Sequence, residues 1–301
     1  MSKTDAARFL MQATLGYDQV LLEDVAATGP RAWLEAQLNN TPSTVRPYEP
    51  ATRALWLSFK ERLVRAHGED LINGDGNNPA LPYKWYFRMA WWQHLLTRRD
   101  DLLRQRVAQA LSEILVVSDA SSLELNSIGM ASYYDLLYDH ALGSYGDLLS
   151  EVALHPMMGI YLTHINNQKA DPVRNIHPDE NFAREIMQLF TIGLFELNPD
   201  GSEKLDAAGK PIPTYDNRDI KEMARVFTGV LPAGYHYEWV TSWWLESYNG
   251  SAVGFNDRVE TAYKTVPFIE ATKPMIIDES FHDRGAKSLL NGGITLPGGQ
   301  D

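Results

Sequence analysis

The sequence predicts a mainly α-helical, multi-helix globular protein with a small β-hairpin excursion. Hydrophobic residues make up 44% of the 301 residues and charged residues 22%, which is ordinary for a chain that folds. In several segments the apolar residues recur at three- and four-residue steps, the spacing of a buried helix face. One stretch, 195–215, instead sets short strand-like pieces between turn residues. No linker divides the chain, so we expect one helical domain over residues 1–301.

The N-terminal part predicts helices joined by polar loops. Gly16 suits a helix C-terminus and Pro30 suits a helix start, so we expect two helices before residue 40. The tract 73–82 is rich in Gly, Asn and Pro, which is typical of an exposed loop. The helices expected in this part cover residues 6–16, 28–40, 55–67 and 84–96.

The clearest helical pattern lies at 100–117. Two shorter helices, at 131–143 and 145–156, should follow, and the polar, proline-bearing segment 162–180 is of the kind that often carries function. The inward face predicted for 100–117 consists of Leu103, Val107, Ala110, Leu111, Ile114 and Leu115.

Two further helices carry most of the charged residues of interest. Pro178 favours the start of a helix that ends near Gly193. Asp216, three residues before Asp219, forms a variant of the capping box and opens the second helix. Turn signals between Phe195 and Tyr215 predict the β-hairpin. On the first helix the inward stripe is expected to be Phe182, Ile186, Leu189 and Phe190, and the polar face Asn181, Arg184, Glu185 and Gln188.

Composition excludes several classes of protein. With 27 Lys and Arg against 39 Asp and Glu, the net charge of −12 argues against a nucleic-acid clamp. Cysteine is absent, which excludes thiolate catalysis, zinc–thiolate sites and disulfides. The longest strongly apolar run, 114–117, is far shorter than the roughly 20 residues that span a bilayer, so we expect no membrane span. No apolar export signal precedes or includes Met1, and no common hydrolase or nucleotide-binding motif occurs.

At HPDENFAREIMQLFTIGLFELNPDG, residues 177–201, the sequence resembles the bacterial "domain of unknown function 1800" family. The resemblance extends in the family's order over most of the chain. It rests also on AARFLMQATLG, LRQRVAQALSEILVVS, YYDLLYDHALGSYGDLLSEVALHPMMGIYL, NQKADP, TYDNRDIKEMARVFTG and FHDRGAKSLL.

This resemblance implies a fold and a setting, since the family's activity is unassigned. Its members are predominantly helical bacterial proteins that often carry export signals and are often encoded beside a partner with a sulfatase-like or phosphatase-like fold. The resemblance therefore implies an extracytoplasmic role. Relatives continue with further helices where this chain stops at PGGQD, so we expect a fragment that is truncated at the C-terminus.

The residues that match the family motif come from three separate charged blocks. If the blocks converge, a cleft with carboxylates, an imidazole and guanidinium groups would suit hydrolysis or metal-assisted chemistry. The alternative is a buried ion-pair network that ties helices together. The catalytic candidates are Glu185 and Asp219 as acid–base carboxylates, Arg184 as an orienting group, and Glu180, His282 and Asp283; Asn181 and Arg225 are candidates for substrate binding, beside the motif residues Asp179 and Glu222.

The histidines and the tryptophans each support a second interpretation. His155, His164 and His177 could cap backbone groups or, with nearby carboxylates, bind a divalent metal, but their spacing is not diagnostic and we predict no metal ligand. Trp243 and Trp244 lie in an aperiodic aromatic stretch, where exposed rings could contact a sugar and packed rings would belong to the core. Trp85, Trp91 and Trp92 are expected in the core or in helix contacts.

Two hypotheses about function follow. The first is an extracytoplasmic hydrolase-like enzyme that acts on a polymer or glycan through the clustered carboxylates. The second is a non-catalytic scaffold or binding protein for an exported partner, in which the charged motif holds the fold together. The cofactor, the substrate and the oligomeric state are not specified by the sequence. Carboxylates that line an open pocket favour the enzyme, and carboxylates sealed between helices favour the scaffold.

Overall fold

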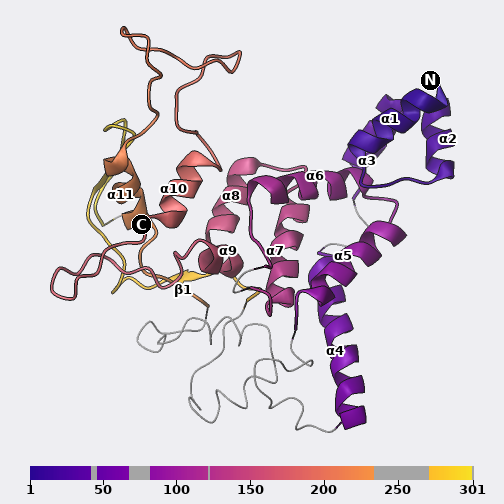
Figure 1. Ribbon diagram of the computed structural model, residues 1–301, viewed down its shortest axis with the longest axis horizontal. Coiled ribbons are helices and arrows are strands. Elements are labelled where there is room, and N and C mark those ends of the chain that lie inside the picture. The colour runs from indigo at the N-terminus through magenta and orange to yellow at the C-terminus, as the bar shows by residue number, and fades with distance from the viewer. Residues whose placement is uncertain (42–45, 68–81, 121–122, 234–270, 300–301) are drawn as a thin grey trace.

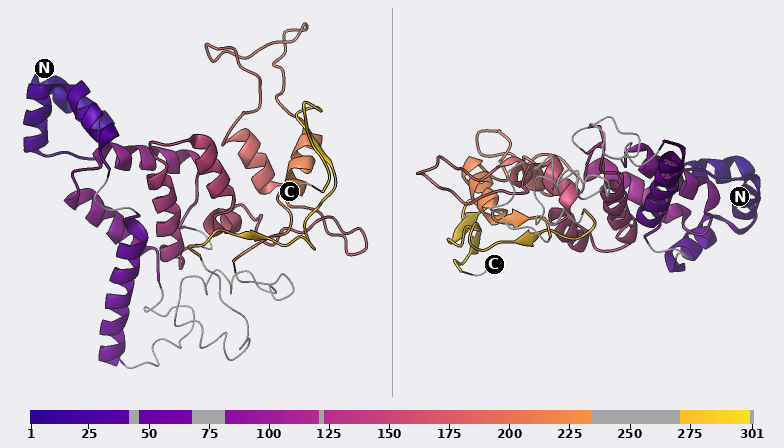
Figure 2. Two further views of the ribbon diagram at one scale, coloured as in Figure 1. Left: turned by 180° about the vertical axis from the view of Figure 1, so that it is seen from behind. Right: turned by 90° about the horizontal axis from the view of Figure 1, so that it is seen from below.

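The computed structural model describes residues 1–41, 46–67, 82–120, 123–233 and 271–299. Over these residues the protein is mainly helical, as predicted, and its helices form an elongated arrangement (Figure 1; Figure 2). The helices are α1 (Lys3–Ala13), α2 (Gln19–Thr28), α3 (Pro30–Asn39), α4 (Tyr48–His67), α5 (Trp85–Thr97), α6 (Leu102–Ile114), α7 (Ser127–Asp139), α8 (Tyr145–Ala153), α9 (Pro156–Tyr161), α10 (Asn181–Gln188) and α11 (Asn217–Val226).

Helix α7 is the centre of the fold because nearly all of its length is buried. Its apolar and tyrosine side chains pack against α4, α5, α6, α8 and α9. A helix that is apolar all round is stable only when other elements cover every face. The main core therefore lies in the middle of the molecule, and the charged helices α10 and α11 lie at one end of it (Figure 1).

The N-terminal end forms a smaller cluster of its own. Here the structure has three helices where two were predicted, because Asp18 caps α2 by accepting the backbone N–H of Leu21 at 2.9 Å. Phe9 and Trp33 meet edge to face, with ring centroids 5.5 Å apart. Together with Leu102 these residues attach α1–α3 to the start of α6.

The described residues contain little β-structure. The strands are β1 (Val230–Leu231), antiparallel to β2 (Ile276–Ile277), and β3 (Lys287–Leu289), antiparallel to β4 (Ile294–Leu296). The excursion predicted at 195–215 is held by isolated antiparallel bridges, such as the one between Phe195 and Pro213. The regular hairpin is the β3–β4 pair, which lies against α11 (Figure 2).

The predicted inward faces need three corrections. On α6, Ala110 and Ile114 are exposed, and the buried side chains are Leu102, Gln105 and Ala108, because Gln105 belongs to a buried polar network. On α10, Phe182 and Phe190 are buried as predicted, but Leu189 is 62% exposed because it ends the helix at its C-cap.

The third correction concerns α5. We expected Trp85 and Trp92 in the core or in helix contacts. The core alternative is wrong, because the two residues are 48% and 54% exposed and α5 packs through Tyr86, Ala90 and His94 instead. In the part of the chain that the structure describes, no helix combines the length and the apolar character needed to cross a bilayer.

Candidate functional site

Helix α11 begins with the predicted capping box. Asp216 accepts the backbone N–H of Arg218, and Asp219 accepts the backbone N–H of Asp216 at 2.9 Å. The second oxygen of Asp219 accepts the backbone N–H of Asn291, in the turn after β3, at 3.1 Å. Asp219 is thus a buried cap that fixes both the start of α11 and the hairpin. Both of its oxygens accept backbone N–H groups, and the residue also lines a hollow between α11 and the β3–β4 hairpin.

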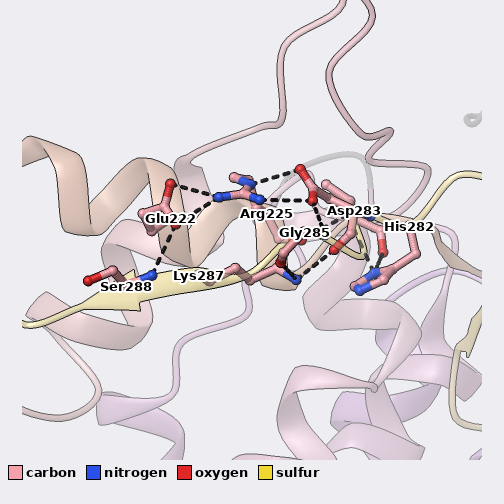
Figure 3. A network of polar contacts seen from close by, with 8 residues as sticks. Glu222, Arg225, His282, Asp283, Gly285, Lys287 and Ser288 are labelled. Atoms are coloured by element: carbon pink, nitrogen blue, oxygen red, sulfur yellow. Dashed lines mark hydrogen bonds and ion pairs between the residues drawn. The ribbon is translucent and has the colours of Figure 1, made fainter. Parts of the chain in front are cut away.

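Nearly two turns further along α11, Arg225 lies between two carboxylates (Figure 3). Its Nε and Nη2 atoms donate to Asp283 at 2.8 and 3.0 Å, and Nη1 donates to both oxygens of Glu222 at 2.8 and 2.7 Å. Glu222 also accepts the backbone N–H of Ser288 at 3.1 Å. Bidentate pairs of this kind are strong and directional. We call Glu222, Arg225 and Asp283 the arginine clamp; it joins α11 to β3 and to the segment before β3.

Within the clamp, Arg225 and Asp283 favour each other's charged forms. Hydrogen bonds from the Arg225 guanidinium lower the pKa of Asp283, against the opposing effect of burial. The hydrogen bonds to Asp283 likewise raise the pKa of Arg225. Gly285 is required beside them, since a Cβ at this position would lie 2.5 Å from Nη2 of Arg225 and 3.0 Å from an oxygen of Asp283. The clamp is therefore tightly packed as well as charged.

His282 lies beside the clamp but is turned into the protein. Its Nδ1 is 2.8 Å from the backbone oxygen of Thr228, and because a carbonyl only accepts, Nδ1 carries the proton. The hydroxyl of Thr228 accepts the backbone N–H of Asp283 at 2.8 Å. The adjacent Gly229 has φ +75° and is packed so closely that a Cβ would lie 2.6 Å from the oxygen of Asp278. His282 thus positions the chain that carries Asp283.

An open cleft of about 420 Å³ has Arg225 and Asp283 of the clamp in its lining. Arg225 and Asp283 form one wall, and the end of the 162–180 loop, with His177 and Glu180, forms the other. Glu180 is half-exposed and lies 3.4 Å from Nη2 of Arg184, one turn along α10. Lys221 of α11 also lines the cleft. The structure thus brings charged residues of the three sequence blocks to one solvent-reached hollow.

Three of the predicted site residues, Asn181, Arg184 and Glu185, lie on α10 but do not line this cleft. Glu185 is partly buried, and its Oε2 has no hydrogen-bond partner among the described residues. Burial, with the nearby Glu185 carboxylate, raises the pKa of Tyr215, and the Arg184 guanidinium opposes this rise. Asn181 is exposed and bonds to Asp179 and, at 3.4 Å, to Thr163. Trp243 and Trp244 lie outside the described residues.

The three other histidines considered from the sequence, His155, His164 and His177, differ in burial. His155 caps α9, and burial lowers its pKa to about 3. His164 donates from Nε2 to the backbone oxygen of Ala153 at 2.9 Å, and burial lowers its pKa to about 4. Both are neutral packing groups, whereas His177 is exposed at the cleft. Among the described residues no group of three or more His, Asp or Glu side chains has the arrangement of a metal site.

Sequence reasoning did not single out Lys221. The residue is four positions before Arg225, so helical spacing alone puts the two side chains on neighbouring parts of one face. The family motif includes the neighbouring Glu222, which belongs to the clamp, and does not include Lys221. The signal was present in the sequence, as a lysine on the same polar stripe as Arg218 and Arg225.

Fold and site together define a class: a mainly helical protein in which an arginine clamp forms one wall of a charged cleft. The chain belongs to the family of proteins of unknown function known as DUF1800, whose model matches residues 8–301. No curated protein and no solved structure matches the chain. The match with the family covers α10, α11 and the clamp, so the cleft is built entirely from the family's own region.

Proposed function

We propose that the protein is a hydrolase-like enzyme that cleaves a glycan or a related polar polymer in the cleft between the 162–180 loop and the arginine clamp. The observation that carries this proposal is the meeting of His177, Glu180 and Asp283 at one open hollow. Carboxylates and an imidazole on a rigid wall are the groups that acid–base hydrolysis uses. The clamp supplies the rigidity, because its bidentate bonds fix Asp283 and Arg225.

The proposed chemistry assigns roles to the cleft residues. Glu180 accepts a proton from the attacking water, and His177 donates a proton to the leaving oxygen as the glycosidic bond breaks. The water oxygen forms the new bond to the sugar carbon. Asp283 stays ionised beside Arg225 and favours the positive charge that develops on the sugar. The roles predicted from the sequence for Glu185 and Asp219 thereby pass to side chains that face the cleft.

Isosteric substitution tests this assignment. Glu180→Gln should abolish the release of reducing ends from a panel of plant, algal and bacterial polysaccharides, while the unfolding temperature stays unchanged. Glu203→Gln, an exposed position in the 195–215 excursion, is the matched control and should keep full activity. Loss of activity in Glu185→Gln alone, with Glu180→Gln active, would restore the assignment made from the sequence and exclude the one made here.

A non-catalytic binding protein is the second candidate. It is favoured by a specific observation: Asp219, Glu222 and Asp283 all use their oxygens to hold α11, the hairpin and the preceding segment together. In this case no polysaccharide in the panel is cleaved, and the Glu180→Gln variant retains every binding property of the protein. The extracytoplasmic location and the exported partner remain predictions that rest on the family resemblance.

A further inference from the structure

A second cleft adjoins the first. It has a volume of about 490 Å³ and lies between α11 and the β3–β4 hairpin. Its walls include Arg218 and Glu222 on the helix and Ser288 and Asn291 on the hairpin. Lys221 lines this cleft and also the cleft of the proposed active site. The two hollows therefore meet at one lysine side chain.

Helix α11 provides a common floor for both clefts. Arg218, Lys221 and Arg225 follow each other at steps of three and four residues, so they lie along one face of the helix. At 1.5 Å per residue this row extends about 10 Å along the helix axis. A ligand that contacts the whole row is longer than a single small molecule of the size of one sugar ring.

The charged side chains along this floor differ in whether they have ion-pair or hydrogen-bond partners. Glu222 and Asp283 are paired with Arg225, and the oxygens of Asp219 accept backbone N–H groups. Lys221, in contrast, is exposed and has no ion pair or hydrogen bond with any residue that the structure describes. A cation without a partner therefore stands at the junction of the clefts, in a chain whose net charge is −12.

We infer that the two clefts form one binding track for a linear acidic polysaccharide, with an anionic group of the polymer on Lys221 at the junction. This inference rests on the proposed function, since it names the substrate class of the same site. The hydroxyl groups of a glycan need acceptors, which Glu180 and the side chains of Ser288 and Asn291 supply along the walls.

Binding measurements on the full chain test the charge requirement. Isothermal titration would compare a hexasaccharide of galacturonic acid with its uncharged methyl ester. Lys221→Gln should weaken binding of the acidic hexasaccharide about tenfold, the effect of losing one charge-assisted hydrogen bond, and should leave binding of the ester unchanged. Lys210→Gln, an exposed lysine of the 195–215 excursion, is the matched control and should bind as the wild type does.

Ligand length tests the continuity of the track. Arg218 lines the second cleft and not the first. Arg218→Gln should therefore weaken binding of the galacturonic acid hexasaccharide and leave binding of a galacturonic acid disaccharide unchanged. Equal binding of the acidic and esterified hexasaccharides overturns the inference, as does wild-type affinity in Lys221→Gln. Failure of both the carboxylated hexasaccharide and a sulfated one to bind also overturns it.

The outcomes separate this inference from the proposed enzyme. Tight, Lys221-dependent binding with no cleavage, or with cleavage that survives Glu180→Gln, contradicts the proposed hydrolysis and leaves the binding track standing. Cleavage of an uncharged glycan that depends on Glu180 but not on Lys221 supports the proposed hydrolysis and contradicts the binding track for an acidic polysaccharide.

Discussion

Two polar clusters in this protein use aspartate in opposite ways. In the centre, Asp101 is buried between α5, α6 and α7 and accepts hydrogen bonds from His94 at 2.8 Å and from Tyr138. At the end of the molecule, Asp283 is partly exposed and pairs with Arg225. His94 and Asp101 are buried, with 8% and 4% of their surface exposed, whereas Arg225 and Asp283 of the clamp line an open cleft. Similar carboxylates thus serve packing in one region and a solvent-reached surface in the other.

The two aspartates differ in the interactions that offset the effect of burial on the pKa of the carboxyl group. For Asp101, burial acts to raise the pKa, and the hydrogen bonds from His94 and Tyr138 reverse this and lower it overall. For Asp283, the guanidinium of Arg225 is the main influence, and it lowers the pKa directly. The central network therefore depends on several hydrogen-bond donors that share one buried acceptor, Asp101, while the clamp depends on one cation, Arg225, that holds two carboxylates.

The largest expected effect is at the centre. Asp101→Ala should reduce the free energy of unfolding by about 3–5 kcal/mol, because His94, Gln105 and Tyr138 lose their buried acceptor together. Urea unfolding followed by circular dichroism measures this. Glu23→Ala, which removes an exposed pair with Lys3, is the control and should unfold at the wild-type midpoint. An equally small effect at Asp101 would show that the two regions do not differ as described.

A smaller effect is expected at the clamp. Arg225→Lys should destabilise the protein by about 1–3 kcal/mol, since an ammonium cannot bridge Glu222 and Asp283 with two bidentate pairs. The measurement is thermal unfolding of the variant beside Arg218→Lys, whose partner Asp216 is exposed and whose midpoint should not move. A stable Arg225→Lys variant would mean that the clamp acts as a simple charge pair without directional bonds.

A third contrast, in the pH dependence of the free energy of unfolding, sets Asp135 against Asp283. Asp135 accepts the backbone N–H groups of Tyr48 and Glu49 at the start of α4, and burial raises its pKa to about 7. Its native state holds a proton that the unfolded state loses, so stability from this group falls as pH rises from about 4 to about 7. For Asp283, with a lowered pKa, stability falls instead as pH drops below about 4.

Asp135→Asn isolates the first of these slopes. The amide cannot ionise, so the variant should lose the decline in unfolding free energy between pH 4 and pH 7 and keep the acid-side decline. Denaturant titrations at closely spaced pH values measure both slopes. A wild-type slope that persists in the variant would assign the decline to another group and remove this contrast between the regions.

The fold could be predicted in outline from the sequence because its signals are local. Apolar spacing located most helices, and the capping box at Asp216 appears as expected. The face of α6 was misjudged because the buried residue is Gln105, whose burial depends on Asp101 and on no pattern of apolar residues. The exposed rings of Trp85 and Trp92 show the same limit, since composition does not say which side of a helix its neighbours cover.

For the site, the sequence predicted that three charged segments converge, but not the contacts that each residue makes. Glu180, Arg225 and Asp283 do lie at one cleft. The role of Asp219 could not be foreseen, because its second partner is a backbone N–H in the distant hairpin turn. That contact exists only in the folded chain, so no local pattern reports it. The same holds for Glu222, whose use by Arg225 and by the Ser288 backbone left Lys221 as the available charge.

The contacts between α11 and the β3–β4 hairpin have a consequence for sequence variation. Glu222 and Asp219 accept hydrogen bonds from the backbone N–H groups of Ser288 and Asn291 in the hairpin, and not from its side chains. Any residue except proline offers the same N–H at these two places, and the positive φ of Asn291, +54°, adds a preference for Asn or Gly at the second. Homologous chains can therefore exchange the outward-facing side chains of this edge, and with them the shape of whatever is recognised there, without loosening the helix that holds it.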